Sequence, residues 1–335
     1  MKRDPHPFAR FIKILGRGKT LTRSLTVDEA DEAMTMILAG QVLPEQLGAF
    51  LMLLRVKEES SEEIAGFVRA ARARLTPPAG APRVDLDWSS YAGKSRQLPW
   101  FILSALVLAL SGWRVFMHGA EAHTEGRVYT GAALHALGVP VATSLEDAAD
   151  RMGEESFAYL PIDSLSPAIA DMLELRPILG LRSPVHTFVR MLNPFGAPAM
   201  IQGVFHPGYM RIHRDAGLIL GQPRLAVFRG EGGEIERRPS KPCDVMMAID
   251  GKALDERWPP MIDEPRQAPD ESMDLSRLAA LWRGAIEDEY GEAAVVGTLA
   301  IALRTLGAVE HVGDAEARAR ALWSARERNR LAAAA

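Results

Sequence analysis

The chain has 335 residues, of which 47% are hydrophobic and 24% are charged, and its formal net charge is −4. This composition is typical of a globular protein long enough for two domains, and it excludes a disordered chain, a membrane protein and a non-selective coat for nucleic acid. The charge is nevertheless segregated, with cations dominating residues 1–23 and 182–229 and acids dominating residues 28–63 and 263–292. Such patterning either builds a positive face on an acidic protein or scatters over the surface, and the sequence leaves both open.

The sequence favours a cytoplasmic protein. Its longest apolar run, Phe101–Leu110, is too short to span a bilayer. No apolar signal core follows the first residues, so no export is expected. The single cysteine, Cys243, excludes an internal disulfide, and we interpret it as a buried thiol in a reducing compartment rather than a catalytic one.

The N-terminal part is predicted to be entirely helical. A capping box at residues 26–29 opens the first helix, Pro44 starts the second, and a second box at residues 60–63 starts the third. The proline-rich stretch 76–80 ends the third helix and forms a stiff linker. We therefore place the domain boundary there.

Beyond the linker, helical and strand patterns alternate, which predicts a mostly parallel sheet flanked by helices. Residues 203–205 are placed in a loop-rich middle section. The expected domains are 1–78 and 79–335, with hinge helices from about 164–192 packing on the first. The predicted strands are 115–119, 139–141, 157–160 and 225–228, and the predicted helices include 98–110, 130–137, 275–283, 293–306 and 314–330.

The segment 91–97 lies between an extended apolar run and the helix that begins near Leu98, which is where an α/β protein usually cradles phosphate. It contains one glycine, Gly93, and two cations, Lys94 and Arg96. Backbone cradling of an anion is therefore weakened here, while attraction by side-chain charge is kept.

Several segments together resemble the anthranilate phosphoribosyltransferase family over nearly the whole chain. The resemblance implies a phosphoribosyltransferase fold of the third structural type, with a small helical domain that mediates dimerisation. The segments that carry it are 25–26, 37–40, 44–46, 49–51, 54–57, 62–66, 118–119, 132–139, 180–182, 193–194 and 203–205.

The family motifs for substrate binding are altered. The loop Gly-Thr-Gly-Gly-Asp, which the resemblance assigns to pyrophosphate, corresponds to residues 91–95. In the Lys-His-Gly-Asn-Arg motif, Met117 replaces the lysine, Ala120 the asparagine and Glu121 the arginine. The acidic pair that positions magnesium falls in residues 230–236, where an isoleucine takes one of the two places and Glu234 or Glu236 remains as a doubtful ligand.

Four residues of the implied substrate site are retained. His118 and Gly119 keep their motif positions, and Arg176 falls where the family arginine holds the anthranilate carboxylate. Arg182 completes the set. The favoured interpretation of His118 is a hydrogen-bonded residue that shapes a turn, and that of Arg182 is a structural salt bridge. For Arg176, a substrate-binding role and a structural role are equally favoured.

A divergent, non-biosynthetic branch of the same family, for which nucleic-acid binding is implied, is resembled by four further segments: 16–19, 91–94, 182–187 and 206–209. Side-chain cations suit an extended polyphosphate better than one pyrophosphate, and binding would then be to the backbone with little sequence specificity. Tyr91 and Trp100 either stack on unpaired bases or pack in the core. The candidate phosphate-contacting residues are Arg17, Lys19, Lys94, Ser95, Arg96, Arg211 and Arg214.

The preferred hypothesis is a homodimer that binds DNA or single strands, lacks normal transferase activity and needs no cofactor. The alternative is an active phosphoribosyl- or glycosyltransferase that uses phosphoribosyl pyrophosphate and magnesium on an unknown acceptor, and a third is a regulatory small-molecule binder. Dimerisation is expected because the first two predicted helices carry more apolar side chains than a three-helix unit can bury by itself. Leu47, Phe50 and Leu51 are among them.

Overall fold

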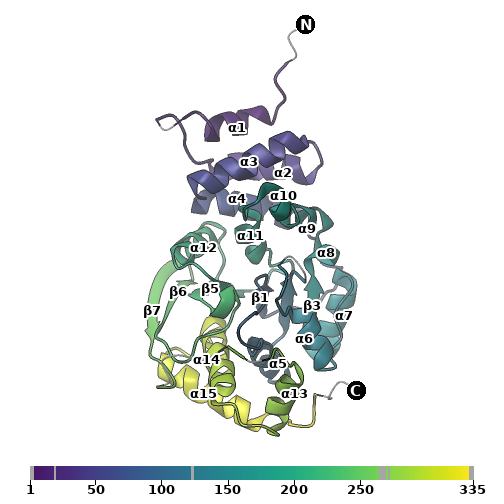
Figure 1. The fold of residues 1–335 in the computed structure, drawn as a ribbon, viewed down its shortest axis with the longest axis vertical. Helices are drawn as coiled ribbons and strands as arrows, with labels where there is room; N and C mark the ends of the chain where they lie inside the picture. The colour runs from purple at the N-terminus through teal and green to yellow at the C-terminus, as the bar shows by residue number, and fades with distance from the viewer. Residues whose placement is uncertain (1–3, 19, 122–123, 264–268, 271, 332–335) are drawn as a thin grey trace.

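The computed structural model describes residues 4–18, 20–121, 124–263, 269–270 and 272–331. A group of helices at the N-terminus sits on a larger unit built around one sheet (Figure 1). This arrangement confirms the predicted fold class, a small helical domain followed by an α/β domain.

The N-terminal helices share a core of edge-to-face aromatic rings. Phe8 lies 5.5 Å from Phe11 and 5.2 Å from Phe50, and Phe50 lies 6.0 Å from Phe67, between ring centroids. The first helix was not expected from the sequence, and its phenylalanines cover apolar surface that was assigned to a dimer contact. The helices are α1 (Ala9–Leu15), α2 (Val27–Leu38), α3 (Pro44–Lys57) and α4 (Ser61–Arg72), and capping boxes open α2 and α4 as predicted.

The sheet has seven strands in the order β3-β2-β1-β4-β5-β6-β7. The first five in this order are parallel, whereas β6 and β7 form an antiparallel hairpin at one edge. The parallel strands are β1 (Leu86–Ser90), β2 (Val115–Gly119), β3 (Phe157–Pro161), β4 (Ala199–Val204) and β5 (Arg224–Arg229), and the hairpin is β6 (Cys243–Ile249) and β7 (Lys252–Trp258).

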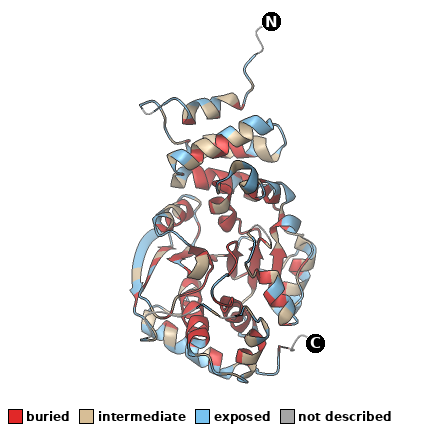
Figure 2. Ribbon diagram, in the orientation of Figure 1, coloured by how far each residue is buried: buried red, intermediate tan, exposed pale blue. Residues whose placement is uncertain are grey.

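Alternate residues along the strands enter two separate cores, as the two-residue period of a strand requires. In β2, Val115 and Met117 enter the core on the side of the C-terminal helices, whereas Phe116 enters the core shared with the N-terminal helices. Both cores are buried in Figure 2. The helices that cover the first of these cores are α5 (Phe101–Leu110), α13 (Ser276–Arg283), α14 (Glu289–Leu306) and α15 (Val312–Ala325).

Short helices connect the sheet to the N-terminal helices. Phe188 in this connection contacts Phe67 of α4, with ring centroids 5.9 Å apart. No helix among the described residues is both long and apolar enough to cross a bilayer. The remaining elements are α6 (Thr130–Ala136), α7 (Leu145–Glu155), α8 (Ile162–Leu165), α9 (Pro167–Leu173), α10 (Arg176–Leu179), α11 (Val185–Phe188), η1 (Val189–Met191), α12 (Gly208–Ile219) and η2 (Glu231–Gly233).

Two local predictions were wrong. Residues 139–141 form no strand, because the chain beside β3 makes only one backbone hydrogen bond to it, from the N–H of Ala142 to the oxygen of Tyr159. Residues 203–204 are not loop but the end of β4, where they pair with Phe228 and Arg229 of β5. Pairing with strands far along the chain is hard to predict from a short segment, especially one that contains glycine, because strand propensity depends on the surrounding structure.

Candidate functional site

The segment 91–97 begins at the carboxyl end of β1, in the middle of the parallel part of the sheet. Ligands of open α/β sheets bind outside this edge. The segment is held by Lys94, whose backbone forms an antiparallel bridge with Val128. The 230–236 segment, which follows β5, packs against it from the other side, through the carboxylates of Glu234 and Glu236.

The carboxylate of Glu234 accepts hydrogen bonds from backbone N–H groups of the 91–97 segment. Its Oε1 accepts hydrogen bonds from the N–H groups of Ala92 and Gly93, both at 2.6 Å. Its Oε2 accepts a third from Ser90 Oγ at 2.9 Å, and the residue is fully buried. Successive N–H groups aimed at one point form the anion site of a phosphate-binding loop. Here a side chain of the protein itself fills that site.

Lys94 points into the interior rather than toward a ligand. Its Nζ lies 2.5 Å from Glu236 Oε1, and the lysine side chain is only 1% exposed. Glu236 also accepts the N–H of Phe101 at 3.0 Å, and burial raises the pKa of this carboxyl to about 7. Lys94 therefore does not present its ammonium to phosphate, contrary to expectation, because a buried carboxylate binds it.

Glu234 and Glu236 do not fit a magnesium ion in this arrangement. Magnesium requires carboxylate oxygens that are free to point at the metal, usually together with phosphate and water oxygens. Both carboxylates instead bind donors of the protein, and Ile235 between them is buried in the core. Within the described residues no group of three or more His, Cys, Asp or Glu side chains could hold a metal ion.

His118 is buried on β2 and has a partner at each ring nitrogen. Its Nδ1 lies 2.7 Å from Tyr91 Oη, and its Nε2 lies 3.3 Å from Asp87 Oδ2. The three side chains connect the ends of β1 and β2 beneath the candidate site. This geometry agrees with a histidine that shapes the loop, and it gives the imidazole no access to a substrate from this position.

Gly119 is required by the close approach of β1. A Cβ atom at this position would lie 2.0 Å from the carbonyl oxygen of Ser90, a distance that no side chain tolerates. Glu121 follows two residues later and accepts hydrogen bonds from Tyr159 Oη and, at 3.1 Å, from the N–H of Gly131 in the first turn of α6. A second carboxylate of the chain thus occupies a backbone donor at this edge of the sheet.

A cluster of arginines lies beside these filled sites. Burial, together with the charges of Arg176, Arg190 and Arg127, lowers the pKa of Arg182 to about 10. Arg127 Nη1 donates to the carbonyl oxygens of Ala92 at 2.7 Å and of Gly93 at 3.2 Å. Arg176 Nη1 donates to Thr124 Oγ1 at 2.7 Å. We call Arg127, Arg176, Arg182 and Arg190 the arginine cluster.

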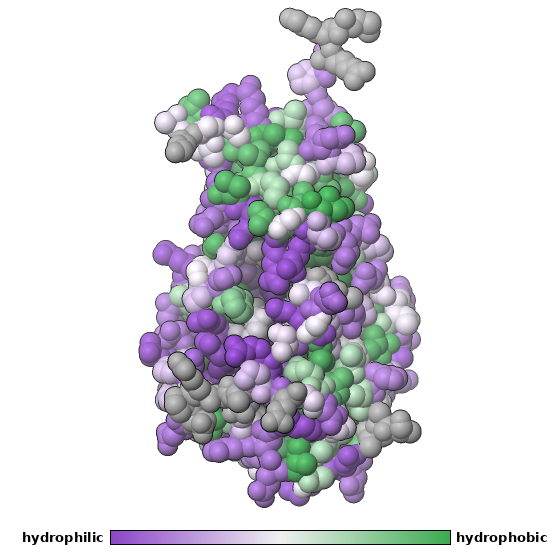
Figure 3. All heavy atoms as spheres, viewed as in Figure 1, coloured by the Kyte–Doolittle hydropathy of each residue, from purple (hydrophilic) through white to green (hydrophobic). Residues whose placement is uncertain are grey.

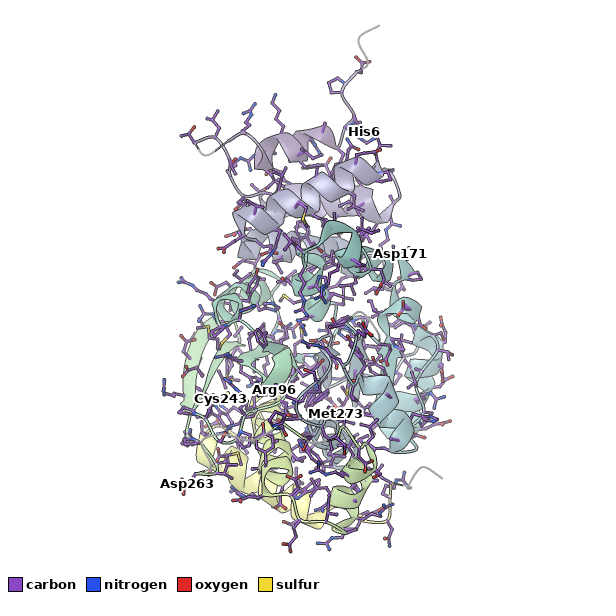
Figure 4. All side chains as sticks on the ribbon, viewed as in Figure 1. His6, Arg96, Asp171, Cys243, Asp263 and Met273 are labelled. Carbon is purple, nitrogen blue, oxygen red and sulfur yellow. The ribbon has the colours of Figure 1, made fainter. Side chains whose placement is uncertain are left out.

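The structure does not gather the other predicted cations into one group. Arg17 is exposed just after α1, at the end of the N-terminal helices remote from the sheet (Figure 1). Lys19 lies outside the described residues. Ser95 and Arg96 are exposed, and Figure 4 shows Arg96 on the α/β domain.

The two predicted arginines of α12 both have acidic partners. Arg211 is 76% exposed and lies 3.4 Å from Asp215. Arg214 is largely buried, and its guanidinium binds Asp215 at 2.9 Å and Asp255 at 2.8 Å. Arg214 is therefore a structural ion-pair residue in this arrangement.

The two aromatic residues considered for base stacking belong to the core. Tyr91 is 2% exposed and Trp100 is 1% exposed. Sequence reasoning overlooked Arg127 and did not assign Arg190 a role, although Arg190 belongs to the basic stretch 182–229. The basic stretch was the signal that could have identified Arg190. Arg127 lies in no motif or basic stretch, so the sequence around it gave no such signal.

Comparisons with known proteins identify the family of the chain. Residues 9–75 match the model of the glycosyl transferase family, helical bundle domain. The uncharacterized Escherichia coli protein YbiB is 29% identical over 253 residues, which cover 74% of this chain and 78% of YbiB. Anthranilate phosphoribosyltransferase of Oleidesulfovibrio alaskensis is 32% identical over 231 residues, covering 68% of this chain and 69% of that enzyme.

The same family appears among solved structures. Anthranilate phosphoribosyltransferase of Thermus thermophilus superposes with a TM-score of 0.80 at 25% identity, over 96% of this chain and 95% of that one. The Saccharomyces cerevisiae enzyme in complex with phosphoribosyl pyrophosphate and magnesium shares the fold, with a TM-score of 0.73 at 15% identity over 95% of this chain and 93% of that one. By sequence and by fold, the chain belongs to the anthranilate phosphoribosyltransferase family.

Proposed function

We propose that this family member binds nucleic acid through the phosphate backbone and does not transfer phosphoribosyl groups to anthranilate. The observation that carries the proposal is the Glu234 carboxylate bound to the N–H groups of Ala92 and Gly93. A pyrophosphate would have to displace a buried anion from those donors. Positive charge is instead presented by guanidinium side chains, which are the usual partners of a nucleic-acid backbone.

The surface around the arginine cluster supports this proposal. In Figure 3 hydrophilic atoms gather across the middle of the visible face, between the N-terminal helices and the α/β domain. Burial and, to a smaller extent, the repulsion of the neighbouring arginines lower the pKa of Arg182, and phosphate groups would offset both effects. An extended polyanion can contact such side chains without entering the filled backbone sites.

We further propose that the protein acts as a homodimer. Phe50 and Leu51, which suggested this, are buried within the N-terminal helices and carry no such contact. Other large apolar side chains are exposed there: Leu43 is 53% exposed, Val56 80%, and Ile178 of α10 79%. Figure 3 shows hydrophobic atoms over this part of the molecule. A two-fold contact would cover them, and a stable monomer in light scattering at micromolar concentration would contradict it.

The second candidate is an active phosphoribosyl- or glycosyltransferase on another acceptor. It is favoured by the comparisons, since several relatives are anthranilate phosphoribosyltransferases. In that case Lys94, Ser95 and Arg96 would handle phosphates, and Glu234 or Glu236 would hold magnesium. Both carboxylates would first have to leave their present partners.

Salt titrations of oligonucleotide binding separate the two candidates. The affinity of the protein for single- and double-stranded DNA is expected to fall as salt rises, because phosphate contacts release counterions. Changing Arg96 and Arg182 together to alanine is expected to reduce the magnitude of the slope by roughly two and to weaken unrelated sequences alike.

Arg257→Ala serves as the control for charge removal, since this arginine is 72% exposed on the edge strand β7. It is expected to leave the slope unchanged. Absence of any binding at low salt would contradict the proposal. Turnover of phosphoribosyl pyrophosphate with magnesium and anthranilate at an ordinary enzymatic rate would also contradict the proposal and would favour a transferase activity.

A further inference from the structure

A small polar cavity lies beside the arginine cluster, at the junction of the N-terminal helices and the α/β domain. Its volume is about 120 Å³. A space of this size accommodates a tetrahedral anion. Its walls come from the end of α3, from the 182–190 segment and from the β4–α12 connection.

Two residues that line the cavity have buried polar atoms without a hydrogen-bond partner among the described residues, namely Ser183 Oγ and Arg190 Nη1. Ser183 is 6% exposed and Arg190 is 8% exposed. Nearly all buried polar groups in native proteins have a partner, so two orphaned donors at one cavity indicate a missing ligand. Both are hydrogen-bond donors, and donors of this kind match an acceptor-rich anion.

The charge around the cavity is not compensated. Within the described part of the chain, neither Arg182 nor Arg190 forms a salt bridge with a carboxylate. Glu234 attracts Arg190 from a distance, but its oxygens are bound to the loop N–H groups. A buried charge without a partner is costly, and two neighbouring guanidinium groups add repulsion to that cost.

Two further titratable groups of the lining bear on the charge of the cavity. Glu59 is the one carboxylate among the lining residues; burial raises its pKa, whereas the hydrogen bond from Tyr209 and the charge of Arg55 lower it. Its Oε2 accepts a hydrogen bond from Tyr209 at 3.1 Å. His213 adds no charge, because burial lowers its pKa to about 3. Its ring lies 2.6 Å from Gln202 Oε1, and Gln202 in turn donates to the carbonyl oxygen of Arg190, which fixes that backbone.

We propose that this cavity binds a phosphate monoester, the terminal phosphate of a nucleotide or of a nucleic-acid strand. Arg182, Arg190 and the Ser183 hydroxyl donate to its oxygens. Two guanidinium groups match the double negative charge of a monoester better than the single charge of a diester or a carboxylate.

The rim of the cavity offers a surface for the attached base. Phe205 lines it and is 51% exposed, and its ring lies 4.9 Å from that of His206. Aromatic rings stack on bases of any sequence. The inference rests on the proposed function, in that it assigns the end of the bound strand to this cavity, but binding of a free nucleotide would stand without it.

Calorimetric titrations with inorganic phosphate, a nucleoside 5′-monophosphate, and oligonucleotides with and without a 5′-phosphate test the proposal. The wild-type protein is expected to bind phosphate and the monophosphate. Ser183→Ala is expected to weaken both about tenfold, the effect of one hydrogen bond to a charged group. Because Ser183 Oγ has no hydrogen-bond partner in the part of the chain that the structure describes, this variant is expected to fold normally.

Arg190→Met gives a second readout that a merely structural arginine would not give. It is expected to raise the melting temperature of the ligand-free protein, because it removes a buried unpaired charge, and to abolish the stabilisation by phosphate. Arg257→Ala is the matched control and is expected to change neither property.

The oligonucleotide arms identify the source of the phosphate. Tighter binding of the 5′-phosphorylated strand, lost in Ser183→Ala, assigns the site to strand ends. Binding of the monophosphate without that preference assigns it to free nucleotides. If no oligonucleotide binds but phosphate does, the proposed function fails while the cavity site stands. Phosphate and monophosphate affinities that are undetectable, or unchanged in Ser183→Ala, overturn the inference.

Discussion

Replacing Lys94 with methionine is expected to destabilise the protein by about 3–5 kcal/mol at pH 8, because it leaves the Glu236 carboxylate buried without its cation. Burial already raises the pKa of Glu236 to about 7, and loss of Lys94 raises it further. A carboxyl whose folded pKa is raised contributes its stability below its unfolded pKa, and that stability is lost as pH rises through the folded value. The destabilisation is therefore expected to be smaller at pH 5 than at pH 8, as measured by urea unfolding.

The controls separate the ion pair from general charge removal. Arg96→Met removes an exposed cation two residues away and is expected to change the free energy of unfolding by no more than about 0.5 kcal/mol. Adding Glu236→Gln to Lys94→Met is expected to restore much of the stability, since the amide keeps an acceptor for the N–H of Phe101. Equal losses in Lys94→Met and Arg96→Met would show that the ion pair does not hold the loop.

Glu234→Ala is expected to cost at least about 2 kcal/mol of unfolding free energy, whereas Glu234→Gln is expected to cost about 1 kcal/mol. Alanine leaves two donors unsatisfied, the N–H groups of Ala92 and Gly93, at about 1–3 kcal/mol each. Glutamine retains an oxygen for both N–H groups, and its amide can donate to Ser90 Oγ.

This exchange is possible because Ser90 Oγ can donate instead to Thr130 Oγ1, which lies 2.7 Å away. Chemical denaturation of the two variants at pH 7 measures the difference. Equal stability of the alanine and glutamine variants would mean that Glu234 does not occupy the loop donors in solution. In that case the N–H groups would be available to a phosphate, and the transferase candidate would gain support.

The fold was largely readable from local patterns and from the family resemblance. Capping boxes before α2 and α4 and the apolar run of α5 each act within a few residues, so their signals survive in the sequence. The β6–β7 hairpin and β4 were missed because their stability depends on partners far along the chain. Helix α1 was missed because its phenylalanines acquire a role only when they meet Phe50.

The candidate site divides in the same way. The sequence by itself determined that the phosphate-loop glycines and a metal carboxylate position had been replaced, because residue identity alone decides which backbone can approach a phosphate. Only the tertiary structure decided that Lys94 turns inward to Glu236 and that Glu234 takes the loop N–H groups. It likewise decided that Arg182 and Arg190 form no salt bridge with a carboxylate in the described part of the chain. These outcomes depend on which charges meet across long stretches of chain, since Lys94 and Glu236 are 142 residues apart in the sequence. Burial and pairing of charge are properties of the assembled interior, where desolvation makes a buried carboxylate bind whichever donor the fold brings to it.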